Sequence, residues 1–344
     1  MLDNILTVDQ KSFDLKILFD LSNKKLDLSE FNQKIDAHLR SYQTTGTNTE
    51  NYSLEQLIPN KQFLIDFRAQ KNEKLNFLFQ EIKDPDVLVF YEKFRPFIDL
   101  LNNKINNQQL ITDLEPNRIA FNPTGSKDGR LSTKKGFLNI YSLAKEERCR
   151  IKCEPGYRFV QCDYRSFQPR LAIFLTKDDA FKRRFADVED IYEGEDREKN
   201  KLDFFRAIFG VEASEQFGFQ PIFDLRKSIF EEIRSKGKII NPFGRPIFYN
   251  GEDENVVFRN FITFCESDFV YGIAVKLDQL LSGRRSRVKF LFHDAAVFEI
   301  HEKETTLLKQ IKQIMENGFN AHYPVKISVG KSWGEMKIYS RPGE

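Results

Sequence analysis

The sequence predicts an α+β protein with a mostly antiparallel sheet and helices on one side of it. Residues 1–110 and 178–238 place apolar residues at spacings of three and four, which is typical of amphipathic helices. Short apolar runs bounded by turn residues, as expected of strands, lie at 157–162, 287–301 and 323–333. The remaining expected elements are a tight hairpin at 240–250 and helices at 255–282 and 304–320.

The composition limits the possible functions. Aromatic residues make up 13% of the chain and include 34 Phe, which excludes a disordered chain and predicts a core built on phenylalanine. Charged residues make up 30%, yet the formal net charge is only +2. A globally basic nucleic-acid-binding protein is therefore excluded, and any site for a polyanion must be local. The 344 residues are enough for two or three domains.

The sequence also predicts the compartment. No apolar run is long enough for a membrane span, and the first residues lack the apolar stretch of a signal peptide. Cys149, Cys153 and Cys162 lie close together, but no His pair or second Cys pair follows, which favours buried free thiols over a zinc site. We therefore expect a cytoplasmic protein with no membrane partner.

Two aspartates are associated with the most apolar strands. Asp163 ends the run FVQC, and Asp294 lies in the turn of KFLFHDAAVFEI. Each alone could be an ordinary turn aspartate. Together they are typical of a carboxylate pair for hard cations, because Mg²⁺ prefers one or two carboxylates plus substrate phosphates.

A helical stripe and a basic loop accompany these aspartates. Arg197, Lys201, Phe205 and Phe209 recur every four residues and so share one face of a helix that ends at Gly210. Cations there suit a triphosphate and rings suit a base, although an ordinary amphipathic helix would show the same stripe. The loop GRLS, with Arg130 and three lysines nearby, suits a phosphate backbone or is a solvated charged loop.

These segments resemble the motifs of the family A DNA polymerases, in the same order and over about residues 117–300. CDYRSFQPRLAIFL is similar to the first catalytic motif of that family, DYSQIELR, and DREKNKLDFFRAIFG to its fingers-helix motif. FLFHDAAVFEI is similar to the third motif, in which HDE lies inside a hairpin. GRLS, INPFGRPIF and, more loosely, FRNFITFCESD resemble three further elements of the family.

The resemblance implies a right-hand polymerase with an antiparallel-sheet palm, helical fingers and a helical thumb. Residues 1–115 would be the thumb-like region, 116–180 the first part of the palm, 181–254 the fingers and 255–344 the second part of the palm with the third-motif hairpin.

The resemblance also implies roles for individual residues. Asp163, Asp294 and the backbone carbonyl of Tyr164 would bind two Mg²⁺ ions, with Mn²⁺ as a substitute, and Lys201 would assist catalysis. The dNTP would be bound by Arg197, Lys201, Phe205, Phe209, Gln168 and Tyr164. Primer–template DNA would be bound by Arg130, His293, Arg170, Arg245, Arg259 and Asn260.

The implied function is that of a template-directed, primer-dependent DNA polymerase that adds dNTPs to a 3′-hydroxyl by two-metal phosphoryl transfer. We expect a monomer. We also expect no 3′–5′ proofreading, because residues 1–115 are too few for both a thumb and an exonuclease domain. Three residues depart from the family. Ala295 replaces an acid that usually follows Asp294, Gln168 replaces a Glu, and Phe209 replaces a Tyr.

These departures leave alternatives open. Ala295 favours a polymerase-derived module that holds primer–template DNA with little or no chemistry. Gln168 and Phe209 favour a polymerase with relaxed choice of sugar or template. A phage-type single-subunit RNA polymerase is disfavoured by the length of the chain and by Phe209.

Overall fold

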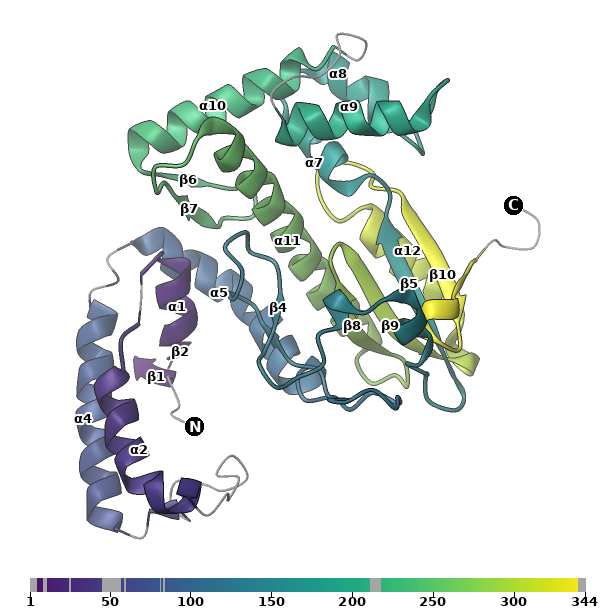
Figure 1. The fold of residues 1–344 in the computed structure, drawn as a ribbon. Helices are drawn as coiled ribbons and strands as arrows, with labels where there is room; N and C mark the ends of the chain where they lie inside the picture. Colours follow the sequence, from purple (N-terminus) through teal and green to yellow (C-terminus); the bar gives the residue numbers. More distant parts are fainter. Residues whose placement is uncertain are drawn as a thin grey trace. The chain divides into compact units, whose positions relative to one another are not determined.

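The computed structural model describes residues 5–8, 11–24, 26–44, 57–58, 60–80, 82, 84–210 and 218–339. The chain divides into two compact units, Met1–Tyr91 and Glu92–Glu344 (Figure 1). Each unit has its own internal contacts, and all the candidate functional residues lie in the second.

The first unit is mainly helical. Its described elements are strands β1 (Ile5–Val8) and β2 (Lys11–Asp14) and helices α1 (Leu15–Leu21), α2 (Ser29–Thr44) and α4 (Lys61–Gln80), while α5 (Pro85–Leu100) runs across the division. The side chain of Asp14 caps α1 by accepting hydrogen bonds from the amides of Lys16 and Ile17. The antiparallel β1–β2 hairpin corrects the expectation of an all-helical N-terminal region. Four-residue strands are shorter than the window in which a helical or strand period can be recognised.

The second unit contains the predicted antiparallel sheet. Its order is β11-β10-β5-β9-β8, and β5 is the central strand. The strands are β5 (Tyr157–Tyr164), β8 (Arg287–Phe292), β9 (Ala295–His301), β10 (Val325–Gly330) and β11 (Lys337–Ile338). Two small hairpins pair β3 (Phe121–Asn122) with β4 (Ser132–Thr133) and β6 (Lys238–Ile240) with β7 (Pro246–Phe248). The hairpins at 240–250 and 287–301 confirm the sequence predictions, whereas β11 was not expected.

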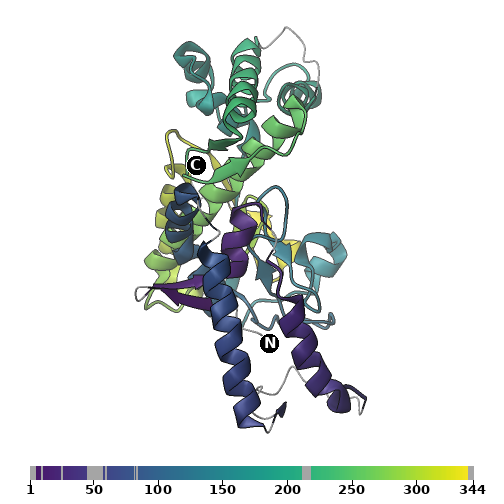
Figure 2. The same cartoon turned by 90° about the vertical axis from the view of Figure 1, so that its left-hand side faces the viewer.

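Seven α-helices are described in full within the second unit: α6 (Lys145–Cys149), α7 (Phe167–Leu175), α8 (Asp179–Ala186), α9 (Arg197–Phe209), α10 (Gln220–Lys236), α11 (Glu254–Leu281) and α12 (Leu307–Glu316). Helix α11 contacts β8, and α12 contacts β10. Figures 1 and 2 show α8, α9 and α10 gathered at one end of this unit and the sheet at the other, with α11 running from one to the other.

Phenylalanine supplies many of the largest fully buried side chains of the second unit, as the composition predicts. Phe159, Phe290 and Phe298 fill the sheet, and Phe204 and Phe258 fill the helices, each fully buried. A buried aromatic ring removes a large apolar area from water, so each of these rings contributes strongly to hydrophobic stabilisation. The packed rings hold the sheet whose end carries the candidate site.

Two further expectations concern the thiols and the membrane. All four cysteines are free: Cys162 and Cys265 are buried, and Cys149 and Cys153 are half-buried. Within the described ranges no helix is long and apolar enough to cross a lipid bilayer.

Candidate active site

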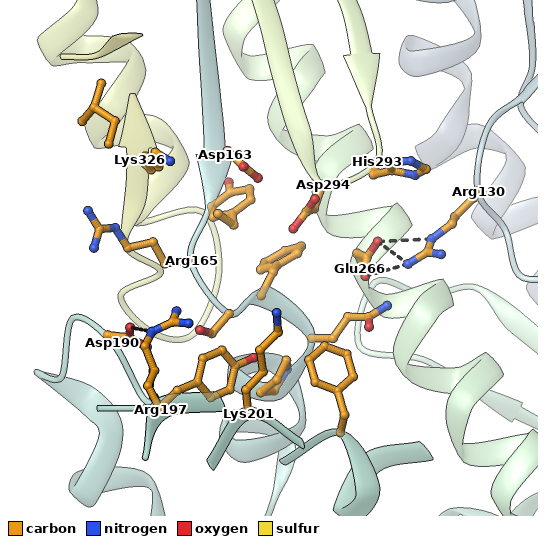
Figure 3. A pocket seen from close by; sticks show the side chains of 18 residues that line it. Arg130, Asp163, Arg165, Asp190, Arg197, Lys201, Glu266, His293, Asp294 and Lys326 are labelled. Atoms are coloured by element: carbon orange, nitrogen blue, oxygen red, sulfur yellow. Dashed lines mark hydrogen bonds and ion pairs between the residues drawn. The ribbon is translucent and has the colours of Figure 1, made fainter. Parts of the chain in front are cut away.

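The sheet brings the two predicted aspartates to the same place. Asp163 is near the end of the central strand β5, and its register partner on β9 is Ala295. Asp294 immediately precedes Ala295 in the turn between β8 and β9. Antiparallel pairing therefore places both carboxylates at one end of the sheet, and Figure 3 shows both within one cavity.

The β8–β9 turn is tight because His293 adopts a left-handed backbone conformation with φ 55°. This conformation is uncommon for a residue with a side chain. The imidazole ring is held 5.1 Å from the ring of Tyr141 and 4.7 Å from that of Phe292, centroid to centroid. Aromatic packing around His293 thus holds the turn that carries Asp294.

The aspartates line a cavity of about 790 Å³. This volume is in the usual range for a small-molecule site. Nine of the residues predicted from sequence line it: Arg130, Asp163, Tyr164, Gln168, Arg197, Lys201, Phe205, His293 and Asp294. The lining residues that sequence reasoning missed are Arg165, Ser166, Phe167, Pro169, Asp190, Tyr192, Glu266, Lys326 and Ile338.

Helix α9 presents its predicted stripe to this cavity. Its N-terminus is capped by Asp196, whose carboxylate accepts a hydrogen bond of 2.9 Å from the amide of Lys199. Arg197, Lys201 and Phe205 line the cavity, and the adjacent face, with Asn200, Phe204, Ala207 and Ile208, is buried. The spacing of four residues thus places a cavity-lining face beside a core face.

Arg197 is held in place by a residue that the motifs do not include. Its Nε donates to Oδ2 of Asp190 at 2.7 Å, and its guanidinium lies 5.5 Å from the ring centroid of Tyr192. Asp190 and Tyr192 come from the loop before α9. The pair is half-exposed, so solvent screening limits its contribution to stability, and its main effect is to orient Arg197.

Arg130 is positioned by a glycine before it and a carboxylate beside it. Gly129 has φ 82°, and a Cβ there would lie 2.4 Å from Cδ1 of Phe264, so a side chain at 129 would clash. The Arg130 guanidinium donates to Oε1 of Glu266 through Nη2 at 3.0 Å and through Nε at 3.3 Å. Glu266 is buried on α11 and also forms a side-chain hydrogen bond with Gln168. A carboxylate inside the apolar run FITFCESDF was the signal that could have revealed it.

Tyr164 faces both the core and the cavity. Its ring is 4.3 Å from that of Phe167 in a stacked arrangement, and its hydroxyl donates to the carbonyl of Met315 at 3.0 Å. Because the side chain is held in the core, Tyr164 can serve a ligand in the cavity only through its backbone.

Burial makes the aspartate pair unusually basic. Desolvation raises the pKa of Asp163, although the nearby Lys326 opposes this. The pKa of Asp294 rises to about 8, first through burial and then through the negative charges of Asp163 and Glu266. Neither Asp163 nor Asp294 has an ion-pair partner among the described residues, so the two carboxylates fit a bound divalent cation, which would relieve their repulsion.

The comparisons with known proteins agree with this geometry. No family model matches the sequence. The chain is 25% identical over 268 residues to the thermostable DNA polymerase I of Thermus filiformis, covering 63% of this chain and 32% of that protein. It is similar to the POL domain of Pol1 from M. smegmatis, solved in complex with DNA primer-template and dNTP, with a TM-score of 0.56 and 19% identity over 93% of this chain and 67% of that one. The chain is thus similar to a DNA polymerase I in sequence and to a polymerase domain in fold. It spans about a third of the length of the Thermus filiformis polymerase.

The fold is that of a family A polymerase domain, which confirms the α+β class and the polymerase architecture expected from the motifs. The third-motif hairpin and the start of the first motif lie side by side, because β9 pairs with β5. Ala295, where the family usually has an acid, is buried opposite Asp163.

Two arginines expected to contact DNA are buried and bonded within the protein. Arg170 is fully buried, and its guanidinium donates to the carbonyls of Arg165, Phe185, Val188 and Glu189. Burial lowers its pKa to about 10.

Arg245, in the β6–β7 hairpin, is also buried. It forms a bidentate pair with Asp268 of α11, with Nη2 and Oδ1 2.6 Å apart and Nε and Oδ2 2.9 Å apart. A charge paired this way inside the protein cannot bind a phosphate without breaking the fold locally. Neither guanidinium lines the cavity, and contact of Arg170 or Arg245 with primer–template DNA stays a prediction.

Three other predicted residues lie outside the cavity lining. Arg259 is exposed and Asn260 half-buried on α11. Phe209 is half-buried, one helical turn beyond Phe205, with the two ring centroids 5.6 Å apart. Contacts of these residues with DNA or dNTP stay predictions.

Because the pKa of Asp294 is raised, we predict that the stability of the protein depends on pH when no divalent cation is present. Folding raises the pKa of this group from 3.8 to about 8, so the folded state holds the proton more tightly than the unfolded state. The free energy of unfolding should therefore fall as the pH rises from about 4 to about 8. Urea unfolding in EDTA at several pH values measures this, and Asp294→Asn should show a flatter profile. An unchanged profile for Asp294→Asn would refute the assignment.

Proposed function

We propose that the chain is a template-directed, primer-dependent DNA polymerase that adds dNTPs to a primer 3′-hydroxyl by two-metal phosphoryl transfer. The observation that carries this proposal is the carboxylate pair Asp163 and Asp294, which has no ion-pair partner among the described residues and faces the cationic side of α9 across one cavity. Phosphoryl transfer needs little covalent help from the protein, and positioning and charge neutralisation supply most of the catalysis.

Asp163, Asp294 and the backbone carbonyl of Tyr164 would hold two Mg²⁺ ions, with Mn²⁺ as a substitute. When bound, the ions lower the pKa of the attacking hydroxyl and offset charge on the leaving pyrophosphate. The donor set fits, because carboxylate and carbonyl oxygens are the ligands that hard cations prefer.

The positions of the cationic residues indicate how the primer and the dNTP would be oriented in the site. Figure 3 shows Arg130 and His293 on one side of the carboxylates and Arg197 and Lys201 on another. The primer terminus would lie against Arg130 and His293, and the triphosphate against α9. Lys201 would neutralise the triphosphate and donate a proton to the leaving group.

The remaining contacts follow from this direction. Phe205 and Gln168, which line the cavity, would contact the sugar of the incoming dNTP, and Phe209 would lie beside the nascent base pair. The side chain of Gln168 is held by a hydrogen bond with Glu266.

The assignment of residue ranges to thumb, palm and fingers is part of the proposal. Residues 1–115 would act as the thumb, 116–180 and 255–344 as the palm, and 181–254 as the fingers. The first compact unit ends at Tyr91, so residues 92–115 belong by contacts with the unit that holds the cavity. The proposed partners are primer–template DNA and dNTPs, bound by a monomer.

A primer-extension assay tests the function. Purified protein, primed DNA template, dNTPs and Mg²⁺ should give longer primers, and Asp163→Ala should not. If the wild type extends no better than Asp163→Ala, the enzyme proposal is lost. We also propose that the chain has no 3′–5′ proofreading. A mismatched, labelled primer in the same assay should therefore keep its 3′ end.

Two observations favour alternatives that the same assay separates. Ala295 beside Asp163 favours a primer–template binding module, which would show salt-sensitive duplex binding without incorporation. The amide Gln168 and the apolar Phe209 favour relaxed sugar or template choice. A strong preference for dNTPs over rNTPs, and for DNA over RNA templates, would exclude this second alternative.

A further inference from the structure

Some charged residues of the cavity form ion pairs within the structure, and others do not. Arg130 pairs with Glu266, Arg197 with Asp190, and Arg165 with Glu189 at 3.2 Å. Two cations of the lining, Lys201 on α9 and Lys326 on β10, have no ion-pair partner among the described residues. The polymerase motifs include Lys201 but do not include Lys326, so the role of this second lysine is open.

Strand pairing places Lys326 beside the first catalytic aspartate. Strand β10 pairs antiparallel with β5, and Lys326 is the direct register partner of Asp163. Directly opposed residues of an antiparallel pair project to the same face of the sheet. Lys326, Asp163 and Ala295 therefore form one row across three strands, and Figure 3 shows Lys326 at the cavity on the side of Asp163 away from Asp294.

A simple ion pair with Asp163 does not account for this lysine. No ion pair joins their side chains, although they are register partners and the positive charge of Lys326 lowers the pKa of Asp163. If Asp163 holds a divalent cation, the ammonium of its register partner Lys326 faces a like charge. Such an arrangement favours a further anion between or beside the two.

We propose that Lys326 is a further binding residue for the phosphate tail of the incoming nucleotide. This inference rests on the proposed function, in which the triphosphate occupies the cavity. Lys201 and Lys326 would hold the tail from different elements, a helix and a sheet strand. Strand β10 is paired with the central strand β5 along its full length, so its lysine belongs to the sheet and offers a positive charge whatever position α9 adopts.

The test compares Lys326→Ala with Lys326→Arg and with Lys337→Ala, which removes an exposed lysine of the neighbouring strand β11. Calorimetric titration with tripolyphosphate in Mg²⁺ measures anion binding without chemistry. Loss of one charge-assisted contact should weaken tripolyphosphate binding and raise the KM for dNTP about tenfold in Lys326→Ala. The kcat and the affinity for primer–template should change less than about threefold, and Lys326→Arg and Lys337→Ala should resemble the wild type.

The outcomes separate this inference from the proposed function. If Lys326→Ala binds tripolyphosphate as Lys337→Ala does, the inference is wrong even when the wild type extends primers. Tighter Mg²⁺ binding with unchanged tripolyphosphate binding also overturns it, because Lys326 would then only neutralise Asp163. If tripolyphosphate binding depends on Lys326 but no variant extends a primer, the anion site stands and the polymerase proposal fails.

Discussion

Asp294→Asn should lower the rate of single-nucleotide incorporation about a thousandfold or more, because metal-ion charge stabilisation is worth several kcal/mol and each 1.4 kcal/mol is a factor of ten. Asn keeps the size of the side chain but removes the charge that a hard cation needs. The turn itself should persist, since His293 and its aromatic neighbours hold it. Rapid-quench measurement of one nucleotide addition gives the rate directly.

The control for this variant is Asp187→Asn, which removes an exposed carboxylate outside the cavity. Primer–template affinity should be retained or increased in Asp294→Asn, because a negative charge near the DNA backbone is lost. Near-normal incorporation by Asp294→Asn, or an equal loss in Asp187→Asn, would contradict the assignment of Asp294 as a cation ligand.

Lys201→Ala should lower kcat/KM for dNTP about a hundredfold to a thousandfold, the usual effect of removing one preorganised charge from a transition state. Lys201 is the cation of the α9 stripe that lines the cavity without an ion-pair partner among the described residues, so its full charge is available to the triphosphate. Much of the loss should be in kcat, because the leaving pyrophosphate gains charge in the transition state. Steady-state kinetics with one dNTP separates kcat from KM.

Lys199→Ala is the matched control, since Lys199 is exposed on the same helix and outside the cavity. Its kinetics should match those of the wild type. Lys201→Arg should recover part of the loss by supplying charge without a transferable proton. A Lys201→Ala enzyme that loses only affinity, with kcat intact, would show that Lys201 binds the tail but takes no part in the chemical step.

Much of the fold could be predicted from local patterns. The alternation of apolar runs and turn residues around His293 marks the β8–β9 hairpin, and the four-residue period marks α9. The β1–β2 hairpin and strand β11 were missed, because strands of two to four residues carry too few positions for a period. Their existence depends on pairing partners that a local window does not contain.

Residues of the candidate site could be predicted where they belong to a sequence motif. Residues that only strand register or helix packing brings to the site could not. Asp163 and Asp294 are each recognisable as a carboxylate at the end of an apolar strand. Lys326 has no such signal, because only the register of β10 on β5 places it beside Asp163. Glu266 similarly depends on the packing of α11 against the Arg130 loop.

The surroundings of Arg170 and Arg245 illustrate the same limit. Arg170 and Arg245 occupy motif positions, but a motif does not show whether a guanidinium faces solvent or the interior. Here one satisfies backbone carbonyls and the other pairs with a buried carboxylate. Arginine is suited to both tasks because its five donors form a rigid planar fork.

Single-nucleotide addition opposite each of the four template bases tests the central claim most directly. In Mg²⁺, the protein should extend the primer by one residue with the complementary dNTP alone, release pyrophosphate, and lose this activity in Asp163→Asn. Binding of the primed duplex without any extension in either Mg²⁺ or Mn²⁺, at every template base, would contradict the account.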